Sequence, residues 1–319
     1  MTPLEQAVLA AGHAPSIFNT QPWSWRIEGA TVQLFADPDR KVTSIDPDGR
    51  LLLLSCGAAL HHARVWLRGS GWSVTVDRLP DSERPDLLAR LVLGKQVPPD
   101  PEAVRMAAVI PRRHTDRRSF GARTVSDFEL TKLRRFVETE GAYLHTVRRE
   151  QVAALAFSMD AAEQAELYDP AYRSDLRAWT QRPGYRGDGV TPDTAVKPGP
   201  RRVPVRDFFP ASRADLDPGI AHDEGAAYVV LFGLGERPID LLRGGEALSA
   251  LLLLATADGL ATAPLSDAVE REWPRQLVRH LLTGLGEPFL IVRLGYRSGR
   301  EPAPASARRD LRDFVTVTA

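Results

Sequence analysis

Two stretches, GAALHHARVWLRGSG at residues 57–71 and GEALSALLLLATADG at residues 245–259, decide how this chain folds. In each, two glycines stand 14 positions apart, and glycine, alanine, leucine and glycine are identical in register. Each stretch predicts a helix that ends on a glycine cap. Because a chain rich in Ala, Leu and Gly could match this far by chance, a second likeness between the two parts is needed.

Paired helix starts supply that second likeness. Thr2-Pro3-Leu4-Glu5 and Ser126-Asp127-Phe128-Glu129 are both typical of a capping box. Each predicted helix leads to a strand-like segment, at 23–27 and 142–147. The sequence therefore favours two related halves, about 1–100 and 101–319.

Further short aliphatic segments predict strands at 73–76, 87–93, 226–232 and 289–294, each bounded by Gly or Pro. Helices and strands alternate without regular βαβ units. This order favours an α+β fold over a doubly wound sheet.

Composition limits the function. The 319 residues carry 41 Lys+Arg and 41 Asp+Glu, and this balance argues against nucleic acid as a partner. The single cysteine, Cys56, excludes an internal disulfide and a cysteine-based metal site. Neither a signal peptide nor an apolar run long enough for a membrane span is evident, so we expect a cytoplasmic protein without a membrane partner.

One region lacks any apolar period. Between 180 and 219, 12 of 40 residues are Pro or Gly. A segment of this length is typical either of an ordered lid over a site or of a solvated insertion, and both interpretations remain open.

Several common sites are absent from the sequence. The seven histidines form no metal-ligand pattern, and neither a phosphate-binding P-loop nor a nucleophile elbow occurs. His61 and His62 are adjacent on a predicted helix, so we expect them to face different ways without a catalytic role. We predict no metal site and assign no catalytic residue.

The loop at 14–23 is rich in hydrogen-bonding groups. Ser16, Asn19, Thr20 and Gln21 lie between two prolines. Such a loop suits the polar edge of a flat heteroaromatic ring, although an ordinary Ser/Asn turn has the same composition.

The segment at 111–120 contains four arginines around a hydroxyl. Arginine donors suit a phosphate, whereas the alternative is a solvated basic turn. Arg113, Thr115 and Arg117 would share one side of an extended segment, which favours the phosphate.

Together these segments resemble the FMN-dependent nitroreductase superfamily. Pro15-Ser16-x-x-Asn19-x-Gln21-Pro22-Trp23 is similar to its flavin-ring loop, and Arg113-x-Thr115-x-Arg117 to its phosphate motif. Residues 259–266 resemble the family segment that borders the flavin, and Arg308 follows a Pro-rich stretch as the last phosphate arginine does. The motif order is reversed relative to ordinary nitroreductases. It is similar to that of the internally duplicated, dormancy-associated Acg-type proteins of actinobacteria.

The resemblance implies a nitroreductase-like fold in which two fused repeats form an intramolecular pseudo-dimer with one FMN. It implies that the ring and the phosphate are held by Pro15, Ser16, Asn19, Gln21, Arg113, Thr115, Arg117, Pro264, Leu265, Ser266 and Arg308. Whether such a pseudo-dimer is a monomer or forms a homodimer stays open.

The resemblance also implies an activity. FMN would take electrons from NAD(P)H and pass them to a small aromatic acceptor, either a nitroaromatic or a quinone. A lidded FMN-storage or sensor protein and a flavin-dependent oxidase are the alternatives, because a fold does not determine the electron acceptor.

Overall fold

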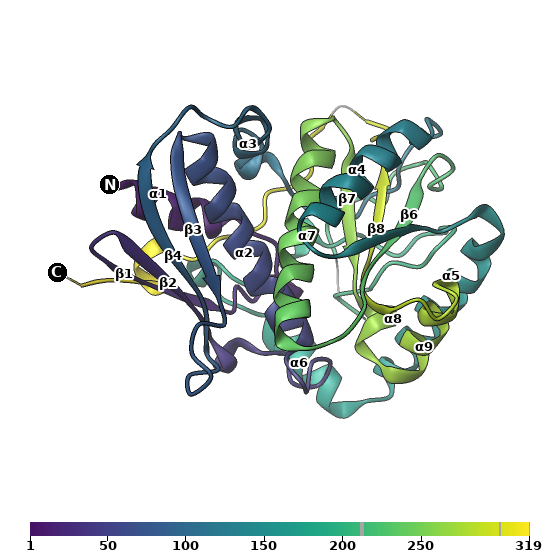
Figure 1. Ribbon diagram of the computed structural model, residues 1–319. Coiled ribbons are helices and arrows are strands. Elements are labelled where there is room, and N and C mark those ends of the chain that lie inside the picture. Colours follow the sequence, from purple (N-terminus) through teal and green to yellow (C-terminus); the bar gives the residue numbers. More distant parts are fainter. Residues whose placement is uncertain (211–213, 300, 319) are drawn as a thin grey trace.

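The structure is a computed structural model that describes residues 1–210, 214–299 and 301–318. It contains two separate sheets with helices packed between and around them (Figure 1). The α+β prediction is therefore confirmed.

The first sheet has five strands in the order β3-β4-β2-β1-β9. Their bounds are β1 Trp23–Glu28, β2 Thr31–Ala36, β3 Trp72–Arg78, β4 Leu87–Gln96 and β9 Val315–Thr318. β9 pairs in parallel with β1, while the other pairs are antiparallel. The end of the chain thus returns to the sheet built by its beginning.

The second sheet has four antiparallel strands in the order β5-β6-β8-β7. Their bounds are β5 Tyr143–Thr146, β6 Ala227–Gly233, β7 Ala261–Leu265 and β8 Glu287–Gly295. All the strands expected from the sequence are confirmed. The strands β2, β7 and β9 were not expected.

The helices are α1 Pro3–Ala11, α2 Arg50–Gly69, α3 Pro101–Ala107, α4 Asp127–Thr139, α5 Val152–Leu167, α6 Pro170–Thr180, α7 Pro238–Ala257, α8 Asp267–Glu270 and α9 Glu272–Leu281. Both predicted capping boxes form, at Thr2 with Glu5 and at Ser126 with Glu129. None of the described helices is both long and apolar enough to cross a membrane.

Helices α2 and α7 pack side by side between the two sheets (Figure 1). Both have 20 residues and begin at Arg50 and Pro238, each seven positions before the glycine that defined its prediction (57 − 50 and 245 − 238). The predicted helices were therefore too short at their starts. The prediction left out the apolar run Leu51–Leu54, which belongs to α2. It also left out Pro238, a residue type that is favoured at the first position of a helix.

The two helices meet at the glycines that occupy the same register position. A Cβ atom on Gly57 would lie 2.9 Å from the Cα of Gly245, and one on Gly245 would lie 2.8 Å from the Cα of Gly57. Real Cβ atoms do not approach so closely, so both positions require glycine.

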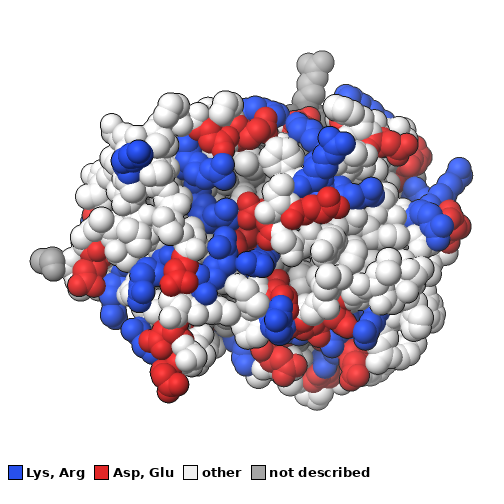
Figure 2. Space-filling view, viewed as in Figure 1, with Lys and Arg blue, Asp and Glu red and all other residues white. Residues whose placement is uncertain are grey.

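Ion pairs also connect residues 1–100 with residues 101–319 beside the contact between α2 and α7. Figure 2 shows Lys and Arg side chains gathered beside α7 on this face. Arg64 of α2 donates to Glu246 of α7 at 2.6 Å and to Glu140 at 2.7 Å, and Arg78 of β3 donates to Glu246 at 2.7 Å. These arginines have carboxylate partners.

Candidate functional site

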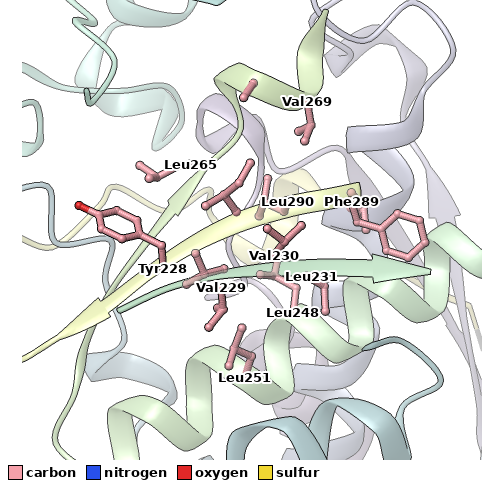
Figure 3. Close-up of a cluster of buried hydrophobic side chains, with 14 of the residues drawn as sticks. Tyr228, Val229, Val230, Leu231, Leu248, Leu251, Leu265, Val269, Phe289 and Leu290 are labelled. Carbon is pink, nitrogen blue, oxygen red and sulfur yellow. The ribbon is translucent and has the colours of Figure 1, made fainter. Parts of the chain in front are cut away.

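A cavity lies where the loop after α1 meets α2, α7 and β7. Seven residues expected at a cofactor line it: Pro15, Ser16, Thr115, Arg117, Pro264, Leu265 and Ser266. Leu248, Leu265 and Leu290 in its wall belong to a buried apolar cluster, which Figure 3 shows around the strands of the second sheet, with Leu248 on the side of α7. An apolar cavity with a few polar groups suits a flat aromatic molecule.

The loop that brings Pro15 and Ser16 to the cavity has a strained backbone. Phe18, Asn19 and Gln21 have φ values of 47°, 54° and 50°, in the left-handed region that non-glycine residues rarely adopt. The Ser16 Oγ accepts a hydrogen bond of 2.9 Å from the Gln21 N–H. Strain of this kind persists only where surrounding contacts impose it, and it is concentrated at functional sites.

Asn19 and Gln21 do not line the cavity. The Asn19 Nδ2 donates to the carbonyl oxygens of Gly189 at 3.1 Å and Ala307 at 3.0 Å, and the Gln21 Nε2 donates to that of Gly187 at 2.8 Å. Their amides therefore hydrogen-bond the loop to two segments that are distant in sequence, one at Gly187 and Gly189 and one at Ala307. Their assignment to the flavin stays a prediction.

Arg113 and Arg308 contact the same carbonyl oxygen, and we refer to their two guanidiniums together as the basic pocket. The Nη2 atoms of both donate to the His13 carbonyl oxygen, at 3.2 and 2.9 Å, and the Arg308 Nη1 donates to Asn19 Oδ1 at 2.6 Å. Arg113 is 2% exposed, and its Nε and Nη1 have no hydrogen-bond partner. Among the described residues, no carboxylate forms an ion pair with either guanidinium.

Burial lowers the pKa of Arg113 to about 10, and burial together with Arg113 lowers the pKa of Arg308 to about 9. The imidazoles of His13 and His114 lie near the same charges: burial, followed by the two arginines, lowers the pKa of both, that of His114 to about 4. Buried cations without a counter-charge are costly. A bound anion would supply the missing counter-charge.

Arg117 lies away from the basic pocket and lines the cavity. Its Nη1 donates to the Thr194 carbonyl oxygen at 2.9 Å, and its guanidinium lies 4.8 Å from the centre of the Phe208 ring. Burial, followed by Arg206, lowers its pKa to about 10. The structure thus divides the predicted phosphate motif: Arg113 belongs to the basic pocket, whereas Thr115 and Arg117 face the cavity.

Sequence reasoning missed a buried group of charges beside the cavity. The Arg206 cluster consists of Arg206, Glu166 of α5, Tyr172 of α6, and Asp267 and Glu270 of α8. Arg206 donates to Glu166 at 3.2 Å, Tyr172 at 2.6 Å, Glu270 at 2.7 Å and Asp267 at 3.0 Å. Local sequence carries no sign of this cluster, because its members come from four separate segments.

The described part of the segment 180–219 packs against both the cavity and the loop. Val205, Arg206 and Phe208 line the cavity, and the Gly189 N–H donates to the Asn19 carbonyl oxygen at 3.2 Å. Residues 211–213 of the predicted lid lie outside the described residues. These contacts favour the interpretation as a lid, which stays a prediction.

His61 and His62 do not face apart as expected. Their Nδ1 atoms both contact the Ser249 Oγ, at 2.7 and 2.8 Å, because the long α7 helix lies against α2 at this level. The His62 Nδ1 also contacts the Ala58 carbonyl oxygen at 3.0 Å. The three side chains form a buried polar bridge between the two helices.

Comparisons with known proteins agree on one family. The chain is 35% identical over 310 residues to "Putative NAD(P)H nitroreductase Rv3131" of Mycobacterium tuberculosis, covering 96% of this chain and 88% of that protein. It is 34% identical over 320 residues to "Putative NAD(P)H nitroreductase acg" of the same organism, covering 99% of this chain and 96% of that protein. No family model matches the chain.

Among solved structures, the FMN-dependent nitroreductase NfnB from Mycobacterium smegmatis in complex with NADPH is similar, at 15% identity and a TM-score of 0.43, covering 68% of this chain and 100% of that one. The full-length likeness to the two M. tuberculosis proteins is the stronger finding. By that likeness, the chain belongs to the nitroreductase family, in the group of Acg-type proteins.

Proposed function

We propose that this protein binds one FMN and uses it to transfer electrons from NAD(P)H to a small aromatic acceptor, a nitroaromatic or a quinone. The observation that carries the proposal is the basic pocket: Arg113 and Arg308 lack a carboxylate partner among the described residues, and both contact the loop after α1, which also lines the apolar cavity. FMN combines a phosphate with a flat ring, and these two features match the two parts of the site.

The residues fall into two groups by location. Arg113 and Arg308 would hold the phosphate with charge-assisted hydrogen bonds, while Arg117 would place a positive charge beside the ring. The rest of the cavity lining would enclose the ring, with Pro15, Ser16, Thr115, Pro264, Leu265 and Ser266 on its walls. Bound flavin supplies the hydride and electron chemistry, and the protein orients it.

The halves 1–100 and 101–319 would be fused repeats. In support, α2 and α7 have the same length and meet at Gly57 and Gly245, which hold equivalent positions. The candidate site combines the loop from the first half with the arginine segment from the second. One FMN per chain is the stoichiometry that this arrangement favours.

A second candidate function is a lidded FMN-binding protein with little turnover. The packing of Val205, Arg206 and Phe208 at the cavity favours it, because NAD(P)H must reach the ring face to reduce it. Both candidates require the same cofactor, and they differ in access.

The test is a visible spectrum of the purified protein, followed by NADPH without oxygen. A yellow protein that bleaches supports the reductase, and one that stays yellow supports the lidded binder. A colourless protein that fails to take up added FMN would overturn both.

A further inference from the structure

The Arg206 cluster contains more acid than its cation can neutralise. Three carboxyl groups contact one guanidinium, and all four side chains are at most 6% exposed. If every carboxyl were ionised, the cluster would hold two uncompensated negative charges away from water. Burial opposes such a state, and a retained proton relieves it.

Two carboxyl oxygens of the cluster lack a hydrogen-bond donor. Glu166 and Glu270 each use Oε2 to accept from Arg206, and the Oε1 of each is buried without a hydrogen-bond partner. A proton on either carboxyl allows it to donate to the other. Burial raises the pKa of Glu166, and the neighbouring Glu270 and Asp267 raise it further against the opposing effect of Arg206.

One carboxyl group of the cluster, that of Asp267, faces the cavity. Asp267 and Arg206 are both in the cavity lining. Burial, and the charge of Glu270 one turn along α8, raise the pKa of Asp267, while Arg206 lowers it. The cluster therefore borders the cavity proposed for the flavin ring, next to which an acceptor would be reduced.

Other charged groups around the cluster do not remove the imbalance. Arg117 is a second cation at the cavity. Glu163 and Asp160 of α5 and Asp207 beside Arg206 add further acid on the other side, and burial together with Asp267, Asp160 and Asp207 raises the pKa of Glu163. The remaining ion pair nearby, Arg271 with Asp169 at 2.6 Å, is internally balanced.

We infer that the Arg206 cluster stores one proton at neutral pH and that Asp267 donates it to the acceptor during reduction. Asp267 is then a catalytic residue, and Glu166 and Glu270 are positioning residues that keep it protonated. This inference rests on the proposed reductase function.

The step balances for a quinone acceptor. Its reduction to a hydroquinone takes two electrons and two protons, of which NAD(P)H supplies both electrons and one proton as a hydride. An O–H bond forms on the acceptor oxygen as the O–H bond of Asp267 breaks. Asp267 obtains this proton from the Glu166–Glu270 pair, where it is stored, and the pair is then refilled from solvent.

The stored proton is testable without cofactor or turnover. Unfolding exposes Glu166, which then ionises above its ordinary pKa, so the folded wild type loses stability as pH rises. Between pH 6 and 9, the unfolding constant of the wild type should rise up to tenfold more per pH unit than that of Glu166→Gln, measured by urea denaturation. Asp160→Asn, an exposed carboxyl on the same helix, should follow the wild type.

Parallel pH profiles for wild type and Glu166→Gln would overturn the stored proton. Should Glu166→Gln not fold, infrared spectroscopy of the wild type at pH 7 decides the question. A carbonyl band from a protonated carboxyl is expected, and its absence contradicts the inference.

Donation by Asp267 is tested by comparing two acceptors. A quinone needs a proton, whereas ferricyanide accepts one electron without any. The ratio of quinone to ferricyanide turnover should fall at least tenfold in Asp267→Asn and stay at the wild-type value in Asp160→Asn. An unchanged ratio in Asp267→Asn overturns proton donation, while a wild type that reduces neither acceptor indicates failure of the proposed function itself.

Discussion

The basic pocket and the Arg206 cluster have opposite charge imbalances. The pocket holds two guanidiniums, Arg113 and Arg308, without a carboxylate, and the cluster holds three carboxyls with one guanidinium. By contrast, Arg64 and Arg78 at the seam between the halves are paired with Glu246 and Glu140. Unbalanced charge of opposite sign is thus the basis of the two proposals, that an anion binds in one region and that a proton is stored in the other.

Removing the cation from each region should have unequal effects on stability. Arg206→Met leaves three buried carboxyls without their partner and should cost about 3 kcal/mol or more in the free energy of unfolding. Arg113→Met in the FMN-free protein removes an unpaired charge and should cost far less, or stabilise it. Urea denaturation measures both.

Arg202→Met is the matched control for Arg206→Met, since Arg202 is exposed in the same segment. Equal losses for Arg206→Met and Arg113→Met would abolish the distinction between the two regions.

Arg117 lies at the cavity and should therefore act on the ring of the flavin. Arg117→Ala should weaken FMN and riboflavin alike, by about tenfold, the effect of one charge-assisted contact. Fluorescence titration of the FMN-free protein with each flavin measures the two affinities. A loss of affinity for FMN but not for riboflavin would contradict this and indicate that Arg117 contacts the phosphate.

The two regions should limit stability at opposite ends of the pH range. Below pH 6.5, unfolded His114 takes up a proton that the folded form, with its pKa of about 4, resists, so stability falls as pH falls. Because His114 is only partly buried, we expect a loss of only about 1 kcal/mol at pH 5. His114→Gln should flatten the acid side of the stability profile and leave the alkaline side, set by the Arg206 cluster, unchanged.

Elements with local signals could be predicted from the sequence. The capping boxes at Thr2 and Ser126 form because their partners lie three residues away. The matching glycine positions of α2 and α7 can be found because each set lies within one continuous stretch of sequence. The cavity loop and the arginine segment were found through their resemblance to a family, since their composition alone also fits ordinary turns.

Long-range partnerships could not be predicted in this way. Arg206 is one of 41 Lys and Arg residues, and nothing near it in sequence indicates contact with Glu166 or Asp267. Strand β9 pairs with β1, although almost the whole length of the chain separates the two strands in sequence. Arg113 and Arg117 share an alternating pattern, but their long side chains reach different partners, and only tertiary packing decides which.

The central claim is that Arg113 and Arg308 form the phosphate site of FMN, and it is tested by comparing FMN with riboflavin, which lacks the phosphate. Wild-type protein should bind FMN at least tenfold more tightly than riboflavin, and Arg113→Ala should lose most of that preference while riboflavin affinity stays near the wild-type value. Equal binding of the two flavins by the wild type, or an undiminished preference in Arg113→Ala, would contradict the account.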